Sequence, residues 1–591
     1  MTQYMVRALA AITALVLGFP LYLTTGMDDP YISFWSAHTL VELGEIVNYN
    51  GARVEQSSSL LHTLILTAAK WVTSTPLPVL GYWCGVLFAG LAALRAPTLA
   101  RRLRWGESAW LVLLVGTAPC LLFYAFGSLE TTIVAWLSVE VAILATDIAA
   151  RRRGAFSPLT VVVTLAYVMV RPEAGIVLGT CLIGWTGLGL LGRRLGYGML
   201  SSSEIARVVR WLLLVATVFA SLCIFRLVYF GEIFPQPVAM KVGGDLLSGA
   251  VSGGKYTAQL VLKSYGVTLA LGLLAVPLVA IAELRKSIWE PDRLLVLLLI
   301  AANASFVIAS GGDWMSAGRF FVHFAPLALV VLFGLGVDAK LSVPTARAFV
   351  ALWLILNVAG TVLLATHRSQ GRPIWAFIEK DPLIREWSHG VDYTWPERAN
   401  QFHTRDILIL GGLSTIIETL LKEKDTVTVM SGQAGMIAYY LAKRFYGRIE
   451  FIDRRALSTR HFESFKGEGG LGTNAFGLDL SLERFVAEAR TRTEPFWSPD
   501  IIFDVWERNA EMVDDRNGYR LVHVQSGTGA PYIEHRDARL YRLFGPRGII
   551  RFKCRLPLYQ FVAVRDDLAN LFEPSRFDWD RERRFRFAGS H

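Results

Sequence analysis

Residues 209–230 read VRWLLLVATVFASLCIFRLVYF, an almost unbroken apolar run of the length that crosses a bilayer. A helix needs roughly 20 mostly apolar residues for this, because lipid offers the backbone no hydrogen-bonding partner. Similar runs recur through the first two thirds of the chain, which predicts a polytopic α-helical membrane protein. We expect about eleven spans, near residues 6–25, 79–94, 108–126, 130–149, 157–170, 174–192, 209–230, 258–283, 293–310, 319–337 and 345–366.

Composition divides the chain into two parts. Apolar residues make up 53% of the 591 and charged residues only 18%, below the roughly 25% of ordinary globular domains. We predict a transmembrane domain at residues 1–366, with a first outer loop at about 26–78, and a soluble domain at 367–591. The apolar segment 57–74 is expected to lie at the membrane interface, because two crossings and a turn do not fit comfortably between Ser57 and Arg95.

Lysine and arginine in the short loops set the orientation. One set of alternate loops carries Arg95, Arg101, Arg102, Arg104, Arg151 to Arg153, Arg193, Arg194, Arg207, Arg210, Arg285 and Lys286. The other set is acidic, so the basic set is expected in the cytoplasm and residues 367–591 outside it. Such loops also account for the net charge of +10 without nucleic acid. The five scattered cysteines show no spacing typical of a disulfide framework or a zinc site.

The soluble part carries an α/β pattern. Val427–Val429, the turn Gly432–Gly435 and the run that follows predict a strand, a Gly-rich turn and a helix, with another strand at 449–452. A lone Gly-x-x-Gly is a weak sign of nucleotide binding, and the outer compartment has no obvious nucleotide supply. We expect an accessory domain that shapes access of an acceptor.

Unusual polar motifs fall on the outer side of this topology. Charges near the membrane are costly and normally mark a site. Five loops that face one compartment are therefore expected to build one pocket. The motifs are Met27-Asp28-Asp29-Pro30, Gly127-Ser128-Leu129-Glu130, Arg171-Pro172-Glu173, Phe234-Pro235-Gln236-Pro237 with Lys241, and Gly311-Gly312-Asp313-Trp314 with Arg319.

Structural explanations compete with a functional one for each motif. Asp29 fits the N-cap of a helix that begins at Pro30, and that helix has an apolar face suited to the membrane surface. Arg171 fits a headgroup anchor, Lys241 a solvated side chain, and Asp313 with Arg319 a structural salt bridge. His323 shares a helical face with Arg319, and its alternative is a buried structural histidine.

These features alone allow either a transporter or a membrane enzyme. Transporters tend to show internal repeats and charged or broken helices at mid-membrane. We find no repeat, and the polar motifs sit at helix ends, which favours an enzyme.

The ordered motifs resemble a known family. An acidic pair after the first span, a long first outer loop, more than ten spans and a soluble C-terminal domain are similar to the GT-C glycosyltransferases, which use polyprenyl-phosphate sugars. More narrowly, the chain resembles the arabinofuranosyltransferases of the mycobacterial AftB and type IV pilin TfpW kinds. The pattern is Asp28-Asp29, Tyr49-Asn50-Gly51-Ala52-Arg53-Val54-Glu55, Gly-x-Leu-Glu at 127–130, Arg171-Pro172-Glu173, Lys241 and Gly311-Gly312-Asp313 with Arg319.

The resemblance implies a multi-pass bacterial inner-membrane enzyme with its site and soluble domain on the periplasmic side. It would transfer a sugar, D-arabinofuranose by this likeness, from a polyprenyl-phosphate donor to a hydroxyl of a type IV pilin or a cell-envelope glycan, with inversion. Asp28 is our expected base, beside Asp29. Lys241, Arg319 and Arg171 would hold the donor phosphate. Sugar or acceptor would contact Glu130, Glu173, Asp313, Trp314, Gln236, Glu55 and His323.

Several alternatives stay open at this point. The same scaffold accommodates another lipid-linked sugar, and a transporter or flippase for a lipid-linked saccharide is the rival from another class. No metal-ligand spacing stands out, although a divalent ion at the phosphate is left open. The identity of the acceptor is not indicated.

Overall fold

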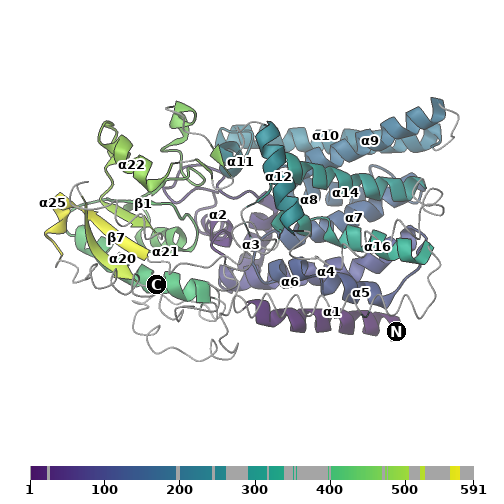
Figure 1. Cartoon of the computed structure of the whole chain (residues 1–591), viewed down its shortest axis with the longest axis horizontal. Coiled ribbons are helices and arrows are strands. Elements are labelled where there is room, and N and C mark those ends of the chain that lie inside the picture. Colours follow the sequence, from purple (N-terminus) through teal and green to yellow (C-terminus); the bar gives the residue numbers. More distant parts are fainter. Residues whose placement is uncertain are drawn as a thin grey trace, which may run out of the picture.

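The computed structural model describes residues 2–22, 27–194, 200–241, 246–260, 290–313, 315, 318–338, 351, 355, 397, 401–468, 473–474, 477–478, 480–504, 519–525 and 560–572. Long helices run side by side at one end of the molecule, and a sheet with its own helices forms the other end (Figure 1). Helices α2 (Pro30–Glu42) and α11 (Gln236–Lys241) lie between these two parts.

The helical part confirms the polytopic membrane fold. Five helices in the described part of the chain are long and apolar enough to cross a membrane: α4 (Leu77–Arg102), α7 (Thr131–Ala149), α9 (Ala174–Arg194), α10 (Ser202–Phe230) and α14 (Pro291–Ala309). Alongside them lie α1 (Thr2–Tyr22), α8 (Pro158–Val170) and α12 (Leu246–Leu260). Apart from residues 258–260, 351 and 355, the predicted spans 258–283 and 345–366 fall outside the described residues.

Two spans expected to be continuous are broken. Residues 108–126 form α5 (Ala109–Gly116) and α6 (Pro119–Ala125), and residues 319–337 form α15 (Arg319–Val322) and α16 (Ala325–Asp338). Pro119 explains the first break, because proline lacks the N–H of a helix interior and fits the first position of a new helix. Continuous apolar character does not reveal such breaks.

Two helices of 13 residues each form much of the first outer loop. α2 and α3 (Leu60–Val72) are about 20 Å long at 1.5 Å per residue, shorter than a bilayer core. The expected membrane-surface role of α2 is wrong: its aromatic residues Tyr31, Phe34 and Trp35 are buried in a core shared with the soluble domain. The apolar face of α2 is thus covered by protein.

The soluble domain is α/β, as the sequence predicts. Its five-stranded sheet has the order β2-β1-β5-β7-β6, in which β1 runs parallel to β2 and β5, and β7 runs antiparallel to β5 and β6. The strands are β1 (Val427–Ser431), β2 (Ile449–Asp453), β5 (Ile501–Asp504), β6 (Tyr519–Gln525) and β7 (Gln560–Arg565), with a small separate pair, β3 (Thr473–Asn474) and β4 (Gly477–Leu478). The helical elements are α20 (Gln401–Leu420), α21 (Met436–Phe445), α22 (Leu482–Ala489), α25 (Asp566–Ala569), η3 (Glu463–Phe465) and η5 (Pro495–Trp497).

Apolar clusters cover both faces of this sheet. One cluster joins α20 and α21 to α2, and the other surrounds Phe462, Phe485 and Trp497. The proposed boundary at 366/367 lies outside the described residues and stays a prediction.

Candidate functional site

Asp29 immediately precedes α2, and its carboxylate faces the membrane domain. Its Oδ2 lies 3.4 Å from Nη1 of Arg319, whose Nε is 2.8 Å from Oδ2 of Asp313. The expected N-cap interaction is wrong, because the Asp29 backbone is helical and its carboxylate accepts no capping hydrogen bond. Pro30 does stand in the first turn of the helix. The Asp29 side chain keeps 27% of its surface exposed, so a ligand can reach it.

Lys241 ends α11 beside this carboxylate. Among the described residues its ammonium group has no ion-pair or hydrogen-bond partner, yet it lies within the electrostatic influence of Arg319, Asp29 and Asp313. Burial and the charge of Arg319 lower the pKa of Lys241. The side chain of Lys241 is half-buried, so it is not freely solvated. We call Asp29, Lys241, Asp313 and Arg319 the Lys241 cluster.

Burial also acts on Asp29. Loss of water raises the pKa of Asp29, whereas the positive charges of Arg319 and Lys241 oppose that rise. The net direction is upward. A carboxylate that holds its proton more tightly is a better acceptor for the proton of a hydroxyl group.

Arg171 lies near the Lys241 cluster but is enclosed by two carboxylates. Its Nη1 is 2.5 Å from Oε1 of Glu130, and its Nε is 2.5 Å from Oε1 of Glu173. All three side chains are nearly buried. The headgroup-anchor explanation is therefore wrong. We call Glu130, Arg171 and Glu173 the Arg171 cluster.

One aromatic ring joins the two clusters. The guanidinium carbons of Arg171 and Arg319 each lie 5.1 Å from the centre of the Phe320 ring, within the range of a cation–π interaction.

The two clusters together bring residues from all five predicted loops close to one another, as the motifs predict.

Two other predicted residues, Glu55 and Gln236, bind to parts of the protein outside both clusters. Glu55 forms a buried bidentate pair with Arg226, at 2.7 and 3.2 Å. The side chain of Gln236 donates to the carbonyl of Ala456 at 3.0 Å. Their polar groups are therefore engaged within the protein. Trp314 lies outside the described residues.

Two histidines are buried near the clusters. His323 packs at 5.8 Å from the Phe320 ring, and its Nε2 has no hydrogen-bond partner in the part of the chain that the structure describes. The same holds for both ring nitrogens of His62, which lies near Glu130. The sequence makes His62 only a weak candidate, because no partner spacing marks it.

Asp28 turns the other way, toward the soluble domain. Its Oδ1 accepts a 2.6 Å hydrogen bond from the backbone N–H of Met436, at the start of α21. The adjacent Gly435 has no room for a side chain, since a Cβ there would lie 2.2 Å from Cγ of Asp28. Neighbouring residues of one sequence motif thus serve two different parts of the molecule.

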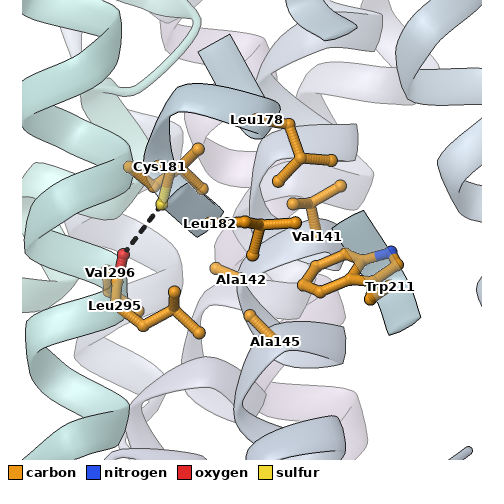
Figure 2. Close-up of a pocket in the computed structure, with 10 residues that line it drawn as sticks. Val141, Ala142, Ala145, Leu178, Cys181, Leu182, Trp211, Leu295 and Val296 are labelled. Atoms are coloured by element: carbon orange, nitrogen blue, oxygen red, sulfur yellow. Dashed lines mark hydrogen bonds between the residues drawn. The ribbon is translucent and has the colours of Figure 1, made fainter. Parts of the chain in front are cut away.

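One small void between the spans is unrelated to these groups. Figure 2 shows a small apolar hollow among α7, α9, α10 and α14, lined by Leu178, Cys181 and Trp211 among others. The thiol of Cys181 donates to the carbonyl of Leu295 at 3.5 Å. Nothing in its lining is charged, and we regard it as imperfect packing between spans.

No group of three or more His, Cys, Asp or Glu side chains within the described ranges is arranged to hold a metal ion.

Comparison with known proteins shows the fold. No family model and no curated protein matches the sequence. The apo oligosaccharyltransferase of Archaeoglobus fulgidus aligns with a TM-score of 0.50 and 12% identity, over 84% of this chain and 69% of that chain. ArnT from Cupriavidus metallidurans, solved with undecaprenyl phosphate, aligns with a TM-score of 0.47 and 13% identity, over 96% of this chain and 99% of that chain.

The archaeal likeness shows that this chain has the GT-C fold, a polytopic helical domain followed by a soluble domain. The narrower resemblance to the arabinofuranosyltransferases is not shown by these comparisons and stays a prediction.

Proposed function

We propose that this protein is a membrane glycosyltransferase that transfers a sugar from a polyprenyl-phosphate donor to a hydroxyl acceptor. The observation that carries the proposal is the Lys241 cluster, in which a partly exposed carboxylate stands beside an ammonium group without an ion-pair partner among the described residues. A base for a hydroxyl and a cation for a phosphate are the two groups that such a transfer needs. The fold of an oligosaccharyltransferase supports the same reaction class.

Asp29 is the proposed base. It takes the proton of the acceptor hydroxyl while the acceptor oxygen bonds to the anomeric carbon of the donor. The bond from that carbon to the phosphate oxygen breaks, and the phosphate leaves with the electron pair. A single displacement of this kind inverts the anomeric carbon.

Asp28 was expected from the sequence to be the base, and the geometry favours its neighbour. The Asp28 carboxylate accepts a hydrogen bond from Met436, whereas the Asp29 carboxylate faces Arg319 and Lys241. Substitution of each residue in turn distinguishes the two assignments.

Lys241 and Arg319 are the proposed phosphate ligands. Lys241 acts as a mobile point charge that is not neutralised by a described carboxylate within ion-pair distance. Arg319 is held by Asp313 through its Nε, and its Nη1 is directed to Asp29. Arg171 is paired with two carboxylates, so we propose that it shapes the site and does not bind the phosphate itself.

The finer assignments rest on the sequence resemblance. We propose D-arabinofuranose as the sugar, a type IV pilin or an envelope glycan as the acceptor, and the periplasmic face of a bacterial inner membrane as the location.

The deciding experiment is transfer of radiolabel from synthetic polyprenyl-phosphoryl-arabinose in micelles, with pilin and glycan acceptors and a panel of other lipid-linked sugars. Wild-type protein should label one acceptor, and Asp29→Asn should not. Donor binding followed by movement across a vesicle membrane, without a new glycosidic bond, would replace the transferase with a flippase.

A further inference from the structure

A strand, a Gly-rich turn and a helix face the first outer loop. β1 ends at Ser431, the turn runs from Gly432 to Gly435, and α21 begins at Met436. In nucleotide-binding proteins this arrangement offers backbone N–H groups and the positive end of a helix dipole to a phosphate.

The protein's own carboxylate occupies that place. Asp28 accepts from the Met436 N–H at 2.6 Å, and a Cβ at Gly435 would lie within 2.3 Å of three Asp28 atoms. Gly435 is therefore required for the close approach of Asp28, and any larger residue displaces it.

The end of the neighbouring strand is also filled from within. The Asp453 carboxylate accepts 2.8 Å hydrogen bonds from the backbone N–H groups of Arg455, Leu457 and Ser458. In dinucleotide-binding folds an acidic residue at this place bonds a ribose. Both anchor points for a nucleotide are thus used by the chain itself.

Further bonds fix the first outer loop along the same edge. The Tyr49 hydroxyl donates to the carbonyl of Ala434 at 2.7 Å. Asn50 donates to the carbonyl of Phe451 and accepts from its N–H, both at 2.8 Å. Asn48 donates to the carbonyl of Ser458 at 3.0 Å.

We infer that the Gly432–Gly435 turn and the start of α21 are a receptor for Asp28, which acts as a positioning residue for Asp29. With Asp28 held on the soluble domain, the next residue along the chain is directed toward Arg319 and Lys241. This inference rests on the proposed function, because it gives the soluble domain a role in placing the base.

The test compares four variants in the radiolabel assay and in donor binding. Asp28→Ala removes the bonded carboxylate, Gly435→Ala displaces it, and Asp28→Asn keeps an acceptor oxygen. Gly154→Ala is the matched control, because a Cβ there meets nothing within 4 Å. We expect Asp28→Ala and Gly435→Ala to lower kcat on the order of tenfold to hundredfold with donor Kd unchanged, since small misplacements of a reacting group cost that much. Asp28→Asn should keep most of the activity, and Gly154→Ala all of it.

A second readout does not depend on transfer. Hydrogen exchange in peptides covering residues 27–40 and 434–440 should rise in both segments in Asp28→Ala and Gly435→Ala, while the rest of the soluble domain stays protected. Unchanged hydrogen exchange in both variants would overturn the inference that the Gly432–Gly435 turn and the start of α21 hold Asp28. Inactive Asp28→Asn together with active Gly435→Ala would make Asp28 the base and overturn its positioning role. Absence of transfer by wild type with every donor would remove the proposed function, whereas raised exchange would still support the receptor.

Discussion

Two arginines share one phenylalanine ring and differ in what surrounds them. Arg171 lies between two buried carboxylates, each 2.5 Å away, so its charge is fully compensated inside the protein. Arg319 lies between Asp313 and the partly exposed Asp29, with the ammonium group of Lys241 nearby. The Arg171 cluster is closed and holds helices together, whereas in the Lys241 cluster the ammonium group of Lys241 has no ion-pair partner among the described residues and can contact a ligand. Residue type alone does not distinguish a structural cation from a binding one.

The largest effect is expected from removal of the base in the Lys241 cluster. Asp29→Asn should lower the transfer rate roughly 10²- to 10⁴-fold, because general-base catalysis contributes that much. Its folding should change little, since the side chain is partly exposed and the amide still accepts a hydrogen bond from Arg319. Radiolabel transfer and thermal unfolding in micelles measure the two effects. Full activity in Asp29→Asn would return the base role to Asp28.

A substitution in the Arg171 cluster should lower the stability of the protein. Arg171→Ala leaves Glu130 and Glu173 buried without their cation, which costs about 3–5 kcal/mol for a buried pair that loses one partner. Thermal unfolding in micelles should show a clear drop. Arg53→Ala is the matched control, because its pair with Glu45 is exposed and should contribute little. Equal stability of the two variants would remove the distinction between the clusters.

A smaller effect is expected from Lys241. Lys241→Ala should weaken donor binding on the order of tenfold to hundredfold, the equivalent of one hydrogen bond to a charged group. Its stability should stay near wild type, because no described carboxylate loses an ion pair. Titration with a non-transferable polyprenyl phosphate measures the affinity. Unchanged affinity would assign the phosphate to other cations.

The smallest effect concerns pH. The base must be deprotonated, so activity should rise with pH through the pKa of Asp29, which burial has raised. The phosphate ligand must be protonated, so donor binding should fall as pH rises through the pKa of Lys241, which burial has lowered. Lys241→Arg should move this alkaline limb to higher pH, because guanidinium stays charged. An alkaline limb that does not move would exclude Lys241 as its origin.

The pattern of apolar residues predicted most of the helices in the membrane part, but it did not predict where a helix is interrupted. The span expected at 130–149 is α7, and that expected at 293–310 is α14, each within two residues. The run 108–126 is interrupted because Pro119 begins a new helix, which a count of apolar residues ignores. Convergence of the outer motifs was predictable, because topology places those loops on one side.

The division of work between Asp28 and Asp29 was not predictable. A local rule assigned Asp29 to a helix cap, but its partner is 290 residues away and that of Asp28 is 408 residues away. His62 carries no sequence signal at all, since its position depends on how α3 packs. Long-range contacts of this kind are set by tertiary packing, which single-sequence patterns do not contain.

The paired hydrogen bonds between Asn50 and the backbone of Phe451 have a consequence for protein engineering. They tie a segment near the start of the chain to a strand of the soluble domain about 400 residues later, so the exchangeable module is not a continuous stretch of sequence. A chimera that receives only a foreign tail would set Asn48, Tyr49 and Asn50 against backbone they were not matched to. Recombination sites should therefore be chosen in pairs, so that residues 27–59 travel with residues 401–572.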